Sequence, residues 1–141
     1  MTPVLVDSNV VLDVATGDPV WASWAVAALE EAQETSILVI NPIVYGELAA
    51  GFGRIEDLDA ALPPDLYRRE AIPFAAAFLA GRAHRLYRDR GGARRTPLAD
   101  FYIGAHAAVA GYRLLTRDAA RYRAYFPRLE LITPPDAPRS S

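Results

Sequence analysis

Short apolar runs alternate along this chain with longer segments in which apolar residues recur every three or four positions. The runs are too short for helices and rich in valine, isoleucine and leucine, a pattern typical of buried strands. Strands that alternate with helices predict right-handed crossovers and a mostly parallel sheet, so we expect an α/β fold. The predicted strands cover residues 4–6, 37–40, 113–116 and 129–133, with an edge strand at 70–72 because Pro73 cannot serve a central ladder.

The helical segments begin at recognisable capping signals. Asp18-Pro19 and Asn41-Pro42 each place an N-cap residue directly before a proline, which suits the first helical position. The predicted helices cover residues 10–15, 18–34, 43–50, 55–62, 73–90, 96–111 and 118–125. In the helix over 73–90, we expect Phe74, Phe78, Leu79, Ala83 and Leu86 to be buried.

The length and the hydropathy pattern indicate a single domain. Of the 141 residues, we assign 1–133 to this domain and 134–141 to a flexible, proline-rich tail. No apolar run has transmembrane length, and the first residues lack a charged segment followed by an apolar one. The sequence therefore predicts a cytoplasmic protein that does not associate with a membrane.

Four carboxylates are predicted to meet at one rim of the sheet. Asp7 and Asp118 directly follow apolar strands, and the carboxyl ends of parallel strands share one edge. Glu47 and Asp100 lie near the starts of helices that begin at the same rim. Clustered carboxylates are costly unless a cation binds among them. Because the chain has only two histidines and no cysteine, the expected ion is one that prefers oxygen ligands, Mg²⁺ or Mn²⁺.

A metal held by carboxylates suits the hydrolysis of a phosphodiester bond. The ion lowers the pKa of a bound water and offsets charge on the phosphate oxygens. Either Asp7 or Asp118 can orient that water, and the sequence leaves the choice open. Structural roles also stay open for Asp118 as an N-cap, for Asp100 beside a helix dipole and for Glu47 as an exposed helix residue. Asp7 is the hardest to explain structurally, because it directly follows a buried strand.

The basic residues are all arginine, 15 in number, while the net charge is −2. This net charge argues against binding nucleic acid through bulk charge, but local arginine clusters bind phosphate groups through bidentate contacts. Arg94 and Arg95, in a glycine-rich loop close to Asp100 in sequence, are the candidates for such contacts. A solvated loop is the alternative. The absence of lysine also disfavours phosphotransfer modules and related phosphatases, and no G-x-G-x-x-G follows the first strand.

Four segments together resemble the motifs of PIN-domain proteins, most closely the VapC-type toxins of bacterial toxin–antitoxin pairs. They are Val4 to Asp13, Asn41 to Leu48, Thr96 to Ala105 and Leu114 to Asp118. The resemblance covers nearly the whole chain. It implies a three-layer α/β/α domain with a five-stranded sheet in the order 3-2-1-4-5. It also implies a homodimer and a small VapB-like antitoxin as partner.

The resemblance further implies a Mg²⁺- or Mn²⁺-dependent endoribonuclease. By motif, Asp7, Glu47, Asp100 and Asp118 are the catalytic, metal-binding acids, and RNA is the substrate. Asn9 and Thr116 are expected to orient those acids or a water molecule. Two alternatives stay open: a PIN-like module that binds a partner without catalysis, and a PIN nuclease that acts on DNA.

Overall fold

The computed structural model describes residues 2–91 and 98–135 as a mixed α/β fold in three layers. Five strands form one sheet in the order β3-β2-β1-β4-β5, and every neighbouring pair is parallel. The strands are β1 (Val4–Val6), β2 (Leu38–Ile40), β3 (Tyr67–Arg69), β4 (Arg113–Leu115) and β5 (Leu131–Ile132). The predicted fold class and strand order are confirmed.

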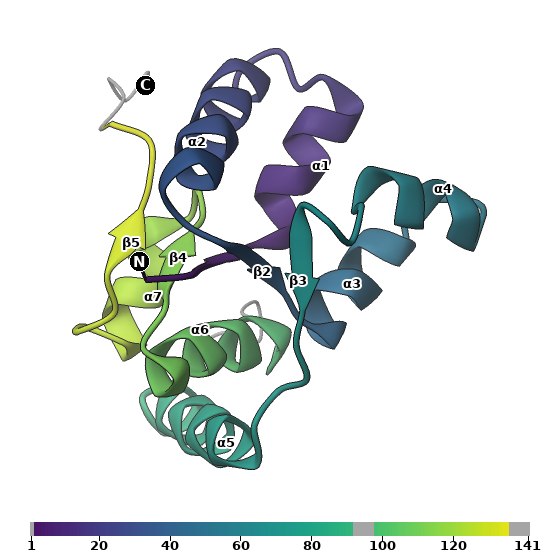
Figure 1. The fold of residues 1–141 in the computed structure, drawn as a ribbon. Helices are drawn as coiled ribbons and strands as arrows, with labels where there is room; N and C mark the ends of the chain where they lie inside the picture. The colour runs from purple at the N-terminus through teal and green to yellow at the C-terminus, as the bar shows by residue number, and fades with distance from the viewer. Residues whose placement is uncertain (1, 92–97, 136–141) are drawn as a thin grey trace.

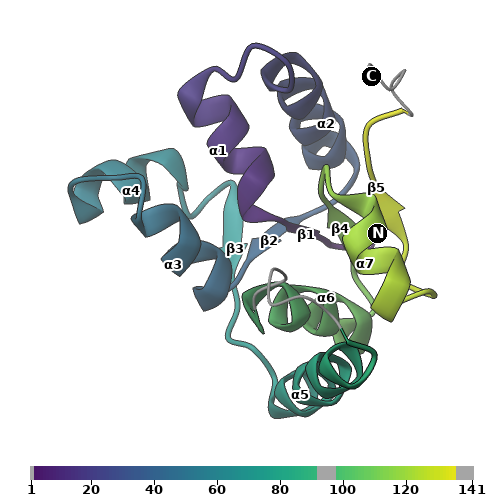
Figure 2. The same cartoon turned by 180° about the vertical axis from the view of Figure 1, so that it is seen from behind.

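Helices cover both faces of the sheet. Figures 1 and 2 show α1 and α2 on one face, α5 and α6 on the other, and α3 and α4 beside the β3 edge. The helices are α1 (Ser8–Thr16), α2 (Ala22–Thr35), α3 (Pro42–Ala49), α4 (Ile55–Ala61), α5 (Phe74–Asp89), α6 (Leu98–Ala110) and α7 (Ala119–Tyr125). In the part of the chain that the structure describes, no helix is both long enough and apolar enough to cross a bilayer.

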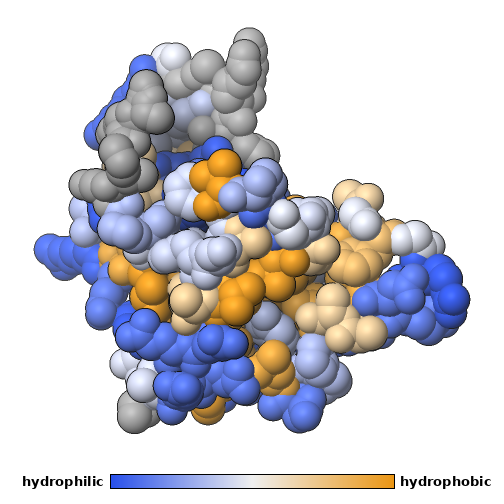
Figure 3. Space-filling model, turned by 90° about the horizontal axis from the view of Figure 1, so that it is seen from above, coloured by the Kyte–Doolittle hydropathy of each residue, from blue (hydrophilic) through white to orange (hydrophobic). Residues whose placement is uncertain are grey.

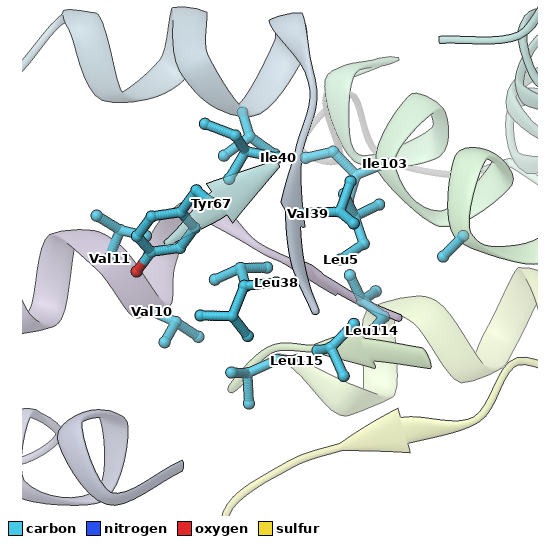
Figure 4. Close-up of a cluster of buried hydrophobic side chains, with 14 of the residues drawn as sticks. Leu5, Val10, Val11, Leu38, Val39, Ile40, Tyr67, Ile103, Leu114 and Leu115 are labelled. Atoms are coloured by element: carbon cyan, nitrogen blue, oxygen red, sulfur yellow. The ribbon is translucent and has the colours of Figure 1, made fainter. Parts of the chain in front are cut away.

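The central strands are buried on both sides, which explains their continuous apolar runs. All three residues of β1 and of β2 are buried. Leu5 of β1 lies opposite Val39 on one side and Leu114 on the other, and Figure 4 shows these side chains close to Ile103 of α6. This packing fixes the register of β1 against β4, and therefore the positions of the residues that follow the two strands.

One of the two predicted capping signals is confirmed, and the other is wrong, because Asp18 closes a turn while α2 begins at Ala22 with Trp21 at its N-cap position. Asn41 caps α3, because its side-chain oxygen accepts a hydrogen bond from the backbone N–H of Val44 at 2.9 Å. Asp18 accepts hydrogen bonds from the backbone N–H groups of Val20 and Trp21. These bonds close a turn over residues 18–21, and α2 begins only after that turn, at Ala22.

The predicted edge strand is wrong in position. Strand β3 occupies residues 67–69, not 70–72, and pairs with β2 through Leu38 opposite Tyr67. The Tyr67 side chain is buried in the core, while Arg68 and Arg69 are exposed. An edge strand tolerates such polar residues because one side of it has no neighbour. Its single buried aromatic side chain therefore sets the register.

The predicted buried face of α5 is also largely wrong. Phe74 and Phe78 are 94% and 67% exposed, and Leu86 is 44% exposed. The helix instead buries a stripe of small residues, Ala76, Ala80 and Ala83, of which only Ala83 was predicted. Small side chains let two helices approach closely, and α5 packs along α6. The close approach of α6 therefore decided which face of α5 is buried, against the hydropathy of the phenylalanines.

Helix α7 rests against α6 at Gly104. A Cβ atom added to this glycine would lie 2.5 Å from the ring of Phe126 and 3.1 Å from that of Tyr122. Since real Cβ contacts are longer, only glycine allows the two aromatic rings to lie directly on the α6 backbone. This contact brings α7 to the rim of the sheet where β1 and β4 end.

Candidate active site

Asp7 occupies the tip of β1, beside the tip of β4. Its backbone N–H donates to the carbonyl of Leu115 at 2.9 Å, which continues the ladder between the two strands. Its carboxylate oxygen Oδ2 accepts hydrogen bonds from the hydroxyl of Thr116 at 2.8 Å and from that of Tyr122 at 3.0 Å. The residue is only 3% exposed. The carboxylate is therefore held in one orientation by two neutral donors.

Asn9 connects the two strand tips. Its side-chain Nδ2 group donates to Asp118 Oδ2 at 3.1 Å and lies 3.4 Å from both Asp7 Oδ2 and Thr116 Oγ1. The Thr116 hydroxyl also accepts from the backbone N–H of Asp118 at 3.0 Å. Asp118 stands at the N-cap position of α7 but makes no capping hydrogen bond, so capping does not account for its carboxylate.

Glu47 and Asp100 approach the same rim from two helices. The Ser8 hydroxyl, at the start of α1, donates to Glu47 Oε1 at 2.7 Å. Asp100 is buried in the first turn of α6. The negative charges of Asp7, Glu47 and Asp118 all act on Asp100. The structure thus brings the four predicted acids together.

Arg121 was not predicted as a member of this site. Its Nη1 atom donates to Asp100 Oδ2 at 2.8 Å and lies 3.8 Å from Asp118 Oδ2. It comes three residues after Asp118 on α7, which places the two side chains on one face of that helix. Tyr122 was missed as well. No sequence signal separates these two residues from the other residues of α7, because their direction depends on how the helix packs on Gly104.

Burial raises the pKa values of two of the acids. The pKa of Asp100 is raised to about 6, mainly by burial and further by the charges of Asp7, Glu47 and Asp118, while Arg121 opposes the shift. Burial also raises the pKa of Asp7, against the hydrogen bonds from Thr116 and Tyr122. Two buried carboxylates that are costly to ionise indicate a site suited to a positively charged group.

The donor set fits a hard divalent cation. All four acids offer oxygen ligands, and Asn9 Oδ1 is buried with no hydrogen-bond partner among the described residues. Across residues 2–91 and 98–135, no three acidic, histidine or cysteine side chains lie close enough together to hold a metal ion between them. Mg²⁺ does not require such a group, because it keeps several waters and binds proteins through one or two carboxylates. The unpartnered Asn9 oxygen is a further acceptor beside the acids.

A second ion pair, next to the acids in sequence, joins α1 to the loop after β4. Arg117, between Thr116 and Asp118, donates through Nε to Asp13 Oδ2 at 2.6 Å and through Nη2 to Asp13 Oδ1 at 3.3 Å. The same guanidinium lies 5.5 Å from the ring centre of Trp21. Asp13 is buried in α1. The pair therefore fixes α1 to the loop after β4, a structural role that the sequence did not reveal.

The two histidines have structural contacts. His106 contacts Asn41 through Nδ1 at 3.0 Å and lies 3.6 Å from Glu70, while His84 packs in an aromatic cluster with Phe101. Both histidines thus have structural contacts away from the four acids. The predicted phosphate contacts, Arg94 and Arg95, fall outside the described residues.

The fold and the acidic rim define an α/β protein of the kind that binds its ligand at the carboxyl ends of its strands. A family model for the PIN domain matches residues 4–127. The chain therefore belongs to the PIN-domain family, as its motifs predicted. A comparison with curated protein sequences gave no match.

Several solved structures share the fold at low sequence identity. VapBC2 from Rickettsia felis, bound to a DNA fragment from its promoter, aligns with 93% of this chain and 98% of its own, with a TM-score of 0.73 and 18% identity. VapBC-1 from nontypeable Haemophilus influenzae covers 93% and 97%, with a TM-score of 0.70 and 17% identity. A toxin–antitoxin complex from Klebsiella pneumoniae covers 94% and 98%, with a TM-score of 0.68 and 21% identity.

Proposed function

We propose that this protein is a divalent-metal-dependent endoribonuclease and the toxin of a toxin–antitoxin pair. The observation that carries the proposal is the convergence of four acids on one rim, two of them buried with raised pKa values. Membership of the PIN-domain family supports a nuclease. The structural neighbours named above are complexes of toxins with antitoxins, which supports the biological setting.

Each acid has a proposed role at the reaction centre. Asp7, Glu47, Asp100 and Asp118 would hold Mg²⁺ or Mn²⁺. When bound, the ion lowers the pKa of a water and offsets charge on the phosphate oxygens. Asp7 is held by two hydroxyl donors, so it keeps one orientation when the phosphodiester approaches.

Asn9 and Thr116 have proposed positioning roles. The Asn9 amide reaches Asp118 and Asp7 at once, and the Thr116 hydroxyl links Asp7 with the backbone of Asp118. Loss of either side chain would let the two carboxylates separate or rotate. We propose that both residues set the spacing of the acids without touching substrate.

The direct test is cleavage of RNA by the purified chain. We expect cleavage of a labelled single-stranded RNA with Mg²⁺ or Mn²⁺, and its loss both with EDTA and in Asp7→Asn. The exposed Asp65→Asn serves as the matched control, because it removes the same charge far from the acids in sequence. Cleavage that is unchanged by EDTA would refute the metal-dependent mechanism. A parallel reaction with single-stranded DNA decides between RNA and DNA as substrate.

An antitoxin is the proposed partner, and the surface of α1, α2 and α4 supports it. Figure 3 looks down on this side of the molecule and shows apolar side chains gathered between hydrophilic ones. Val14, Val20 and Ile55 are exposed on these elements and the turn between them. Exposed apolar patches of this kind mark protein interfaces. Expression of the chain in the bacterial cytoplasm should slow growth, and co-expression of a small cognate antitoxin should restore growth.

A non-catalytic binding module is the remaining alternative. It shares the fold and the proposed partner but requires no activity from the four acids. Growth inhibition by wild type that persists in Asp7→Asn would favour this alternative over the nuclease.

A further inference from the structure

Arg121 forms ion pairs with two of the four acids. Its guanidinium bridges Asp100 and Asp118, with Nη1 at 2.8 Å and 3.8 Å from one oxygen of each. The Asp100 side chain is 8% exposed and that of Asp118 is 36% exposed, whereas Arg121 is 40% exposed. The arginine is therefore partly exposed to solvent while it contacts the more deeply buried Asp100.

Within residues 2–91 and 98–135, no other arginine forms an ion pair with the four acids. Arg117 is next to Asp118 in sequence, yet its guanidinium is bound to Asp13 and stacked near Trp21. Among the described residues, Arg121 has no comparable hydrogen-bonded carboxylate other than those acids. It lies on a short helix, and its side chain is 40% exposed, so solvent reaches it.

Asp100 and Asp118, which Arg121 contacts, are two of the four acids proposed to hold the metal. A divalent ion held by these acids would repel the guanidinium and would take its place. Arginine remains protonated in proteins, so the displaced group keeps its charge and its five N–H donors. The partner that best matches a planar, charged donor near such a site is a phosphate group, which guanidinium binds in a bidentate manner.

We infer that Arg121 alternates between two partners, the metal-site carboxylates when no ion is bound and a phosphate of the RNA backbone when the ion is bound. The inference rests on the proposed nuclease function and extends it to a coupling between the two ligands. Because coupling between sites is reciprocal, RNA should tighten metal binding by the same factor as metal tightens RNA binding.

Titration of the metal-free protein with Mn²⁺ tests, without any catalysis, whether Arg121 competes with the ion for the carboxylates. In Arg121→Gln no guanidinium has to be displaced, so Mn²⁺ should bind about three- to tenfold more tightly than in wild type. The control is Arg123→Gln, which removes the same charge from an exposed position on the same helix and should leave Mn²⁺ affinity within about twofold of wild type. Arg121→Lys keeps the charge and guards against loss of fold, with an affinity close to that of wild type.

A second experiment tests whether Arg121 binds an RNA phosphate when an ion is bound. It follows the binding of a fluorescein-labelled 12-nucleotide RNA by anisotropy, in Ca²⁺ and in EDTA. A gel after each titration verifies that the RNA is intact. Arg121→Gln should weaken RNA binding several-fold in Ca²⁺ and little in EDTA, where the wild-type arginine is held by the acids. Arg121→Lys should also bind RNA less tightly in Ca²⁺, because lysine lacks the planar fork.

The two measurements must move in opposite directions, which a merely structural role would not produce. If wild type binds Mn²⁺ but Arg121→Gln binds it no more tightly, the inference is wrong and the nuclease proposal survives. If wild type does not bind Mn²⁺ at all, the nuclease proposal itself fails. Equal RNA binding by wild type and Arg121→Gln in Ca²⁺ would also overturn the inference.

Discussion

Asp100→Asn should make the metal-free protein more stable near neutral pH. Asp100 is 6% exposed, and its pKa is raised to about 6 from 3.8, mainly by burial. An acid whose pKa is higher in the folded state holds its proton more tightly there than in the unfolded chain. Its contribution to the free energy of unfolding is therefore fully present below about pH 4 and lost as the pH rises through about 6.

The size of this effect follows from the shift. Roughly two pKa units correspond to about 3 kcal/mol between the protonated and ionised forms. The amide of asparagine carries no charge, so the variant avoids this cost at neutral pH. Since relaxation of the site reduces the cost, we expect a gain of about 1–3 kcal/mol in the free energy of unfolding near pH 7.5. The gain should approach zero near about pH 4, where Asp100 is protonated in wild type as well.

Urea unfolding in EDTA, near pH 7.5 and near about pH 4, measures the difference in unfolding free energy between the variant and wild type at each pH. Asp65→Asn, an exposed position, is the control and should change stability by less than about 0.5 kcal/mol at either pH. Addition of Mg²⁺ should reduce the difference in stability between Asp100→Asn and wild type, because only wild type keeps its full set of metal ligands. A variant that is less stable than wild type near neutral pH would refute the reasoning and show that the ion pair with Arg121 outweighs burial.

Two further substitutions test the packing that surrounds the site. Gly104→Ala should lower the free energy of unfolding by about 1–3 kcal/mol, because its methyl group would meet the ring of Phe126. Urea unfolding measures this change, and a variant as stable as wild type would contradict the close contact. A homodimer stays a prediction, and the exposed phenylalanines of α5 offer a surface for it. If that surface is used, Phe74→Ser with Phe78→Ser should lower the molar mass measured by light scattering from that of a dimer to that of a monomer, while unfolding stability stays close to wild type.

The alternation of strands and helices and the acids beside the strand ends were predictable from local signals, whereas the strand order was predicted from the resemblance to PIN-domain proteins. Each buried run marks a strand, but the neighbouring positions of the strands before Asp7 and Asp118 were implied only by the resemblance to PIN-domain proteins, and the structure pairs these two strands. The exposed face of α5 was not predictable from hydropathy, since the alanine stripe is chosen by its neighbour α6. Arg121 and Tyr122 were missed for a related reason: their roles depend on a helix-to-helix contact at Gly104 that leaves no periodic pattern.

The order of synthesis has a consequence for when this site can exist. Strand β4 inserts between β1 and β5, so until residues 113–115 have been made, β1 has an unpaired edge. The Asp7 carboxylate must also wait for the hydroxyls of Thr116 and Tyr122, more than 100 positions later in the chain. Such distant contacts form slowly. A growing chain therefore carries no assembled acidic site until residues up to Tyr122 have been made and folded.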